Sequence, residues 1–127
     1  MGKSIDMESL ADAVAAYGFA YLITVGDNAQ IHTSAVNPVV ADAALTIPGT
    51  SAHSRANADR NPNISLVWPP TEDGGYSLIV DGEARASTDS SDGALRISPS
   101  RAVLHRPAAR PGPAHADSTC LSDCVEL

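Results

Sequence analysis

Residues 76–86, YSLIVDGEARA, are the stretch that decides the fold. Leu78 and Val80 fall on one side of an extended chain, whereas Asp81 and Glu83 fall on the other. A period of two is the pattern of a β-strand, in which successive side chains point to opposite faces of a sheet. The stretch therefore predicts a long strand.

Five further segments predict strands around this one. They are residues 19–25, 30–40, 44–47, 63–68 and 94–105. Turn signals separate them, among them Gly26-Asp27-Asn28 and the Asp42-Ala43 pair. We expect the last strand to break near Pro99, because proline donates no ladder hydrogen bond.

Two segments predict helices. Apolar residues recur every three or four positions from Met7 to Tyr17, which predicts a helix with Asp6 as the N-cap and Gly18 as the stop. The polar residues 51–60 predict a short helix that the following Asn-Pro pair ends. The fold class is therefore mainly β (α+β): a six-stranded antiparallel barrel with one N-terminal helix and one short helix between strands three and four.

The composition excludes several classes of protein. The chain has 127 residues, 43% hydrophobic and 18% charged, which is typical of one globular domain. Eight basic against fifteen acidic side chains leave a net charge of −7, so no nucleic-acid partner is expected. No apolar run reaches the roughly 20 residues that cross a bilayer, and residues 1–10 lack the apolar stretch of a signal peptide.

Charge and proline content divide the chain in two. Residues 1–93 hold twelve acidic and four basic side chains, whereas residues 94–127 hold four arginines, three acids and four of the nine prolines. We expect a barrel domain over residues 1–107 and a proline-rich, flexible tail over residues 108–127. Both cysteines lie in this tail, so no disulfide framework is predicted and the expected compartment is the cytoplasm.

Four strings, in their order and spacing, resemble the pyridoxamine 5'-phosphate oxidase-like family of flavin-binding split β-barrels. They are GFAYLITV at 18–25, HTSAV at 32–36, ANADRNPNISLV at 56–67 and LIVDGEARA at 78–86. They are similar to the family's first strand, its second strand, its helix-to-strand junction and its glycine-containing strand. The resemblance covers residues 7–107 and implies that the predicted barrel is a split barrel.

The resemblance implies a homodimer that binds a flavin in the groove between two barrels. Flavin mononucleotide (FMN) is the first expectation, with a deazaflavin as the alternative. The cofactor would transfer hydride or electrons to a small-molecule substrate, which makes the chain a flavin-dependent oxidoreductase. A second hypothesis is a binding module that holds a flavin, deazaflavin or haem without turnover, and a third is a purely structural partner.

The family holds the cofactor's phosphate on the segment between the third strand and the next helix, where amides, hydroxyls and cations meet a dianion. By this resemblance the cofactor-binding residues are Thr50, Ser51, His53, Ser54, Arg55 and Asn57. The family's Ser-Arg-Lys string is not retained here. Counted back from Asn61 without a gap, its places fall on Ala52, His53 and Ser54. With a gap, Ser54 and Arg55 take the Ser-Arg places and the lysine place falls on Ala56. In both alignments Arg55 supplies the one permanent charge.

Other polar and aromatic residues have two interpretations each. His32 and Asn37 on the second strand either serve the fold or contact the flavin, depending on the strand register. Trp68 fits the core or the dimer interface, or alternatively stacks near a bound ring. The tail cysteines lack metal-ligand spacing, so no metal is expected, and no catalytic residue is assigned.

Overall fold

The structure is a computed structural model, and it describes residues 5–86, 93–107 and 122–127. Its elements, in chain order, are α1 (Met7–Ala16), β1 (Ala20–Val25), the 3-10 turn η1 (Asp27–Ala29), β2 (Ile31–Val36), β3 (Val39–Ala41), β4 (Ala44–Ile47), α2 (Ala52–Arg60), β5 (Asn63–Trp68), β6 (Ser77–Ala86), β7 (Leu95–Pro107) and β8 (Ser122–Glu126). In these ranges the chain is mainly β with two α-helices, as the sequence predicts.

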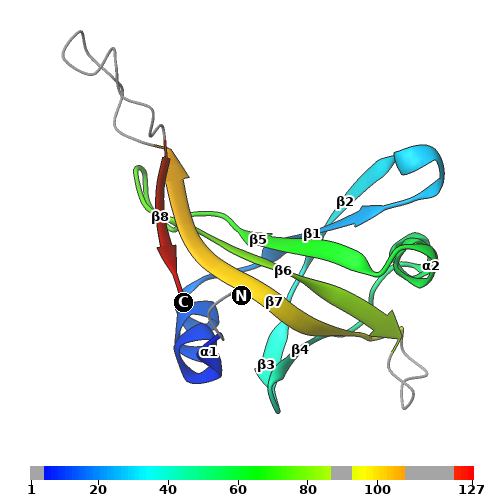
Figure 1. Ribbon diagram of the computed structural model, residues 1–127, viewed down its shortest axis with the longest axis horizontal. Helices are drawn as coiled ribbons and strands as arrows, with labels where there is room; N and C mark the ends of the chain where they lie inside the picture. Colours follow the sequence, from blue (N-terminus) through cyan, green and yellow to red (C-terminus); the bar gives the residue numbers. More distant parts are fainter. Residues whose placement is uncertain (1–4, 87–92, 108–121) are drawn as a thin grey trace, which may run out of the picture.

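The strands form one antiparallel sheet whose two edges are joined by two residues. The strand order is β2-β1-β5-β6-β7-β4-β3, and β8 pairs with the end of β7. β2 and β3 lie at opposite ends of this order, yet only Asn37 and Pro38 separate them in the chain. The sheet therefore curls until its edges approach each other (Figure 1), which gives the predicted split barrel.

The inside of the curl holds the hydrophobic core. Alternate side chains of β5 and β6 point into it, as the period of two indicates. The fully buried large side chains include Leu10, Leu22, Leu45, Ile47, Leu66, Trp68, Leu78, Val80, Leu95 and Ile97. Each contributes roughly 1.5–3 kcal/mol of burial free energy, so the core rests on a small number of large aliphatic groups and one tryptophan.

The helix α1 begins where the sequence predicts. The Asp6 carboxylate accepts hydrogen bonds from two first-turn amides, at 3.1 and 3.2 Å. The helix ends at Ala16, before the expected stop at Gly18, because Tyr17 already has extended backbone. The Tyr17 hydroxyl donates to the carbonyl of Tyr76 at 2.8 Å, which ties α1 to the start of β6, and burial raises the pKa of this phenol.

The predicted strand over residues 30–40 is in fact two strands. β2 ends at Val36 and β3 begins at Val39, because Pro38 has no N–H to donate and interrupts the ladder. Within β2 the even-numbered side chains His32, Ser34 and Val36 are the more buried ones. The interruption is what allows β3 to leave β2 and pair with β4 instead.

The strand β7 passes through Pro99 without the predicted break. Its pairing with β6 shifts between Asp81 and Gly82, so an irregularity in the ladder takes up the proline. Beyond β7 the sequence predicts only a tail. Residues 108–121 of that tail lie outside the described residues, and β8, which the sequence did not predict, pairs with the last five residues of β7.

Gly82 faces the backbone of β7 at this shift. A Cβ placed there would lie 2.5 Å from the carbonyl oxygen of Ser98 and 3.1 Å from the Cα of Pro99. We therefore expect Gly82→Ala to lower the free energy of unfolding by about 1–3 kcal/mol in urea titrations, the usual cost of overpacking. Gly18→Ala is the matched control, since no atom lies within 4 Å of its added Cβ. Equal free energies of unfolding for the two variants would contradict the close approach of Gly82 to the β7 backbone.

Candidate functional site

The start of α2 is fixed by two of the predicted serines. The Ser51 hydroxyl accepts from the N–H of Ser54 at 3.1 Å and donates to the Ser54 hydroxyl at 3.0 Å. Ser54 is fully buried, and its hydroxyl lies 3.4 Å from that of Ser34 on β2. The two serines therefore lie together, and their hydroxyls hold the first turn of α2 against the sheet.

Arg55 and Thr50 connect α2 to the segment before β7. The Arg55 guanidinium donates to the carbonyl of Thr50, whose hydroxyl donates to the carbonyl of Gly93. Gly93 has a φ of +80°, and a Cβ there would clash with the guanidinium, so this position requires glycine. Arg55 also lines a small hollow of about 150 Å³ together with Asp59 and Arg85.

Asn57 lies on the inward side of α2. Its amide donates to the Thr24 hydroxyl on β1 at 3.1 Å, and the two residues are only 6% and 0% exposed. Leaving either polar group unpaired in the interior would cost about 1–3 kcal/mol. This hydrogen bond therefore fixes α2 against β1 and has a structural role of its own.

His53 of α2 and His32 of β2 stack face to face. Their ring centroids are 4.3 Å apart and their planes differ by 9°. His53 is exposed, whereas the Nδ1 of His32 is buried and has no hydrogen-bond partner in the part of the chain that the structure describes. The stacked pair forms part of the wall of a cavity between α2 and the β1–β2 hairpin.

This α2 cavity has a volume of about 420 Å³. Its lining residues are Gly26, Asp27, Gln30, Ile31 and His32 of the hairpin, and His53, Ala56, Asn57 and Arg60 of α2. Arg60 forms an ion pair with Asp27. The hydrogen bond that the Arg60 guanidinium donates to Asp27, together with the negative charge of that carboxylate, raises the pKa of Arg60. The two charges of the pair cancel, so the permanent net charge of the lining is close to zero.

The six residues predicted to bind the cofactor do not form one surface. His53 and Asn57 are four positions apart on α2, and both line the α2 cavity. Arg55 is two positions from each of them and lines the small hollow instead, because residues two apart lie on different sides of a helix. Ser51 and Ser54 complete the helix start, and Thr50 precedes it.

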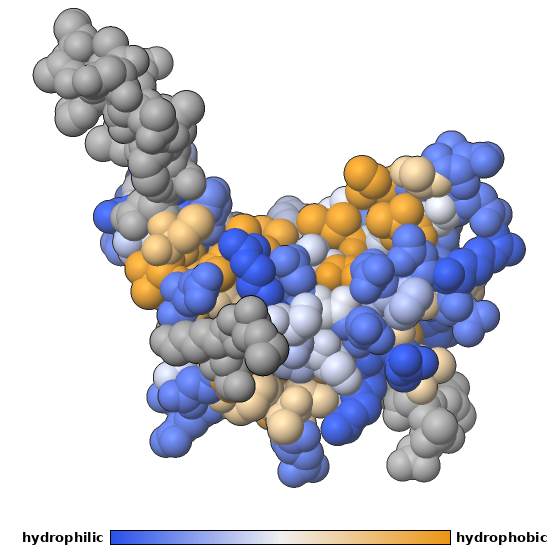
Figure 2. All heavy atoms as spheres, viewed as in Figure 1, coloured by the Kyte–Doolittle hydropathy of each residue, from blue (hydrophilic) through white to orange (hydrophobic). Residues whose placement is uncertain are grey.

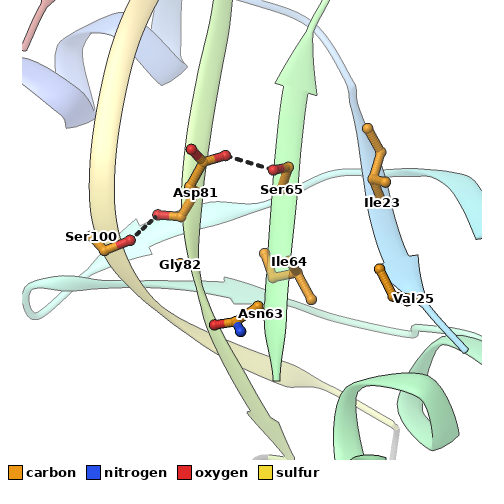
Figure 3. Close-up of a pocket in the computed structure, with 8 residues that line it drawn as sticks. All are labelled: Ile23, Val25, Asn63, Ile64, Ser65, Asp81, Gly82 and Ser100. Atoms are coloured by element: carbon orange, nitrogen blue, oxygen red, sulfur yellow. Dashed lines mark hydrogen bonds between the residues drawn. The ribbon is translucent and has the colours of Figure 1, made fainter. Parts of the chain in front are cut away.

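A second cavity of about 370 Å³ lies on the outer face of the sheet (Figure 3). Its lining residues are Ile23, Val25, Asn63, Ile64, Ser65, Asp81, Gly82 and Ser100. Figure 3 shows the apolar Ile23 and Val25 of β1 on one side and the polar Ser65 and Asp81 on the other. Apolar walls with a few placed polar groups are typical of small-molecule sites, and we name this the outer-face cavity.

Asp81 organises the polar side of the outer-face cavity. One of its carboxylate oxygens accepts from the Ser65 hydroxyl at 2.5 Å, and the other lies 3.4 Å from the Arg101 guanidinium. The Ser100 hydroxyl donates to the backbone carbonyl of Asp81 at 3.2 Å. The two contacts from Ser65 and Arg101 involve the charged carboxylate and hold it in one orientation, whereas the bond from Ser100 fixes the backbone of β6.

Three exposed apolar side chains lie near the β1 side of the outer-face cavity, since Tyr21 shares a face of β1 with Ile23 and Ile31 pairs with Val25. Phe19, Tyr21 and Ile31 are 42%, 39% and 73% exposed, and the first two rings pack edge to face at 5.0 Å. Figure 2 shows hydrophobic atoms gathered over β1, β2 and β5. Exposed apolar side chains grouped in this way are typical of a binding or contact face.

Sequence reasoning missed much of both cavities. Ser65 and Asp81 become partners only through the register of β5 and β6, and Arg60 joins the α2 cavity through the rotation of α2. One signal was available in the sequence. Ser65 and Asp81 are polar residues at positions that the alternation of apolar side chains places on the outer face of the sheet. Trp68 lies in the core and is 0% exposed, which confirms the first interpretation given above.

The predicted tail features fall mainly outside the described residues, as do Cys120 and His115. Cys124 is described; it is a free, exposed thiol 3.0 Å from the Nδ1 of His105. Within the described ranges, no three side chains of the metal-binding types gather. Among those same residues, no helix has the length and apolar character needed to cross a membrane.

Two curated relatives match almost the whole chain. They are the uncharacterized proteins Mb0449c of Mycobacterium bovis and MT0457 of Mycobacterium tuberculosis, each 40% identical over 135 residues, which covers 97% of this chain and 94% of the relative. This identity over nearly full length makes the three proteins members of one family. No family model matches the sequence.

Solved structures give this family its fold. A Clostridium acetobutylicum protein related to general stress protein 26, described as of the pyridoxinephosphate oxidase family, superposes with a TM-score of 0.64 at 14% identity and covers 97% of both chains. The chain therefore has the fold of this structure. Further split barrels with this fold are an FAD-binding protein of Mesorhizobium loti (TM-score 0.62, 14% identity, 79% of this chain and 92% of that one) and an F420 reductase (0.57, 13%, 80% and 98%).

In this fold the core lies on one face of the sheet. The hydrogen-bonded Ser65 and Asp81 lie on the other face, and the hydrogen-bonded Ser51 and Ser54 lie at the start of α2. The Asn57–Thr24 pair sets the position of α2 in this arrangement. The α2 cavity therefore depends on a buried hydrogen bond that the outer-face cavity does not use.

Truncation of Asn57 tests this dependence. We expect Asn57→Ala to lower the free energy of unfolding by about 1–3 kcal/mol, because the Thr24 hydroxyl is then buried without its donor. Gln30→Ala, an exposed position of the same cavity, should change it by less than about 0.5 kcal/mol. Adding Thr24→Val to Asn57→Ala should restore part of the loss in urea unfolding. If the losses of unfolding free energy from the two single variants simply add in the double variant, the energetic coupling between Asn57 and Thr24 is contradicted.

Proposed function

We propose that this chain binds a flavin-type cofactor on the outer face of its barrel and acts as a cytoplasmic, homodimeric oxidoreductase of small molecules. The observation that carries the proposal is the outer-face cavity. There the apolar Ile23 and Val25 lie opposite the hydrogen-bonded Ser65 and Asp81. A flavin ring has apolar faces and hydrogen-bonding edges, so it fits a cavity of this composition.

The position of the two cavities supports the proposal further. Val25 lines the outer-face cavity, precedes Gly26 and pairs with Ile31, and these two line the α2 cavity. A ligand with a flat ring and a charged tail suits two neighbouring cavities of different character. We propose that the phosphate lies at α2. Of the six candidate residues there, His53 and Asn57 line the α2 cavity, whereas Thr50, Ser51, Ser54 and Arg55 lie at or beside the start of the helix, outside the cavity lining.

FMN is the cofactor we propose first. The solved structures described as an FAD-binding protein and an F420 reductase support a flavin or a deazaflavin in this fold. The lining of the α2 cavity has one guanidinium, which is already paired with Asp27. That lining suits a single phosphate better than a longer polyanionic tail, so a deazaflavin is the alternative.

When bound, the flavin supplies hydride or electron transfer. The residues of the chain bind and orient it. Ser65 and Asp81 offer a fixed hydroxyl and carboxylate at the edge of the ring, and Ile23 and Val25 exclude water from one of its faces. In this proposal no side chain needs to act as an acid or base, and the substrate is a small molecule.

We propose that a second copy of the chain covers the outer face. Phe19, Tyr21 and Ile31 are apolar and exposed next to the outer-face cavity, and burying them against a symmetric copy would remove this surface from water. The same contact would close the cavity over the ring. Dimerisation and flavin binding are then expected to strengthen each other.

Flavin binding tests the site directly. We expect FMN to bind saturably, one per protomer, with quenching of flavin fluorescence. Ile23→Lys should weaken this binding about tenfold or more, because it places a charge on the apolar wall. Val39→Lys is the control, since Val39 is an exposed valine on β3, away from the cavity lining. A native protein that binds neither FMN nor a deazaflavin would overturn the proposal.

The oligomeric state tests the outer-face contact. Ile31→Arg should shift the protein from dimer to monomer in sedimentation velocity, because the charge would lose its water in the interface. Val125→Arg, at an apolar position on β8 that is 44% exposed, should leave the dimer intact. A native protein that sediments as a monomer at all concentrations would contradict the proposed dimer.

A further inference from the structure

A cysteine and a histidine lie side by side where the last strand meets β7. β8 pairs antiparallel with the end of β7, and this register places Cys124 directly opposite His105. Side chains of directly opposed residues share one face of a sheet, and the Sγ of Cys124 lies 3.0 Å from the Nδ1 of His105. Figure 1 shows β8 beside this end of β7. Neither residue lines the outer-face cavity or the α2 cavity.

The thiol of this pair is open to solvent. Cys124 is exposed and free, and it is the one cysteine in the part of the chain that the structure describes. In the sheet, β5, β6 and β7 separate β8 from β1, the strand that carries Tyr21 of the proposed dimer contact. A second copy seated on β1 and β2 leaves this distant strand uncovered. A small molecule in solution therefore reaches the sulfur.

The contact with His105 gives the thiol a base. The thiolate, and not the thiol, is the nucleophilic form of cysteine. A neutral imidazole within hydrogen-bond distance takes the proton as the sulfur attacks, which is how a paired base activates a nucleophile. When the Nδ1 of His105 accepts from Sγ, the neutral ring carries its own proton on Nε2. The pair therefore holds a nucleophile and a proton acceptor in reacting geometry.

We propose that Cys124 and His105 form a site of thiol–disulfide exchange that takes small aliphatic disulfides, R–S–S–R. The Sγ of Cys124 attacks one sulfur of the disulfide while the Nδ1 of His105 takes the thiol proton. A new S–S bond forms on Cys124 as the original S–S bond breaks. The leaving thiolate takes the proton from His105 and departs as R–SH. The Cys124 sulfur is oxidised and the leaving sulfur is reduced, so the disulfide itself is the oxidant and the product is a mixed disulfide on β8.

Single-cysteine forms of the full chain measure the reactivity of this site. The sequence has two cysteines, so Cys120→Ser leaves Cys124 as the only thiol. The matched control adds Cys124→Ser and Val125→Cys, which moves the thiol by one residue to an exposed position opposite Leu104. The probe is hydroxyethyl disulfide, which is uncharged, and the adduct is followed at neutral pH by mass spectrometry of the intact protein. We expect Cys124 to form the mixed disulfide about tenfold faster than the control thiol, or more.

Variants at His105 test whether the imidazole transfers a proton. In the Cys120→Ser background, His105→Gln should slow adduct formation to the rate of the control thiol, with the circular dichroism spectrum unchanged. His105→Ala should be equally slow, and imidazole added to the solution should restore part of the rate, because a free base can take the place of the missing ring. A histidine that only shapes the strand pair would give no such rescue.

Three results would overturn the inference. They are a reaction of Cys124 at the rate of the control thiol, an unchanged rate in His105→Gln, and a His105→Ala variant that imidazole does not rescue. None of these measurements involves a flavin. Failure of this site and failure of the proposed function are therefore distinguishable.

Discussion

The two-residue link between β2 and β3 is the constraint on which the rest of the structure depends. Asn37 and Pro38 join the two edges of the sheet, so the sheet has to curl. Curling turns the even-numbered side of β1, β5 and β6 into a filled core and leaves the other side uncovered. The outer-face cavity and the exposed apolar side chains around it lie on that uncovered side, so the closure that makes the core also creates the candidate site.

The position of α2 is the second determinant, because it separates two kinds of surface. The buried Asn57–Thr24 hydrogen bond and the Ser51–Ser54 contacts fix the helix in rotation as well as in place. One side of α2 then meets the β1–β2 hairpin with two histidines, and another meets the segment before β7 through Arg55. The polar segment of residues 51–60 therefore contributes side chains to two separate places, the α2 cavity and the small hollow lined by Arg55.

Much of the fold was predictable because local patterns were consistent. The alternation in residues 76–86 predicts that Leu78 and Val80 are buried, and both are 0% exposed. The misassigned strand over residues 30–40 alternates through its proline without interruption, so the pattern alone did not reveal where the chain leaves one sheet edge for the other. At Pro99 the sequence predicts a break that does not occur. Gly82 on the neighbouring strand allows the pairing to shift, so the ladder continues past the proline.

By itself, the sequence determined which segments are strands, which of their faces are apolar, and where α1 begins, because these depend on residues close together in the chain. The tertiary structure alone decided that His32 stacks on His53 and that Ser65 bonds to Asp81. Those partners come from separate elements, and their meeting depends on strand register and helix rotation. Register and rotation are fixed only when the whole barrel packs, since each is a compromise among contacts distant in sequence.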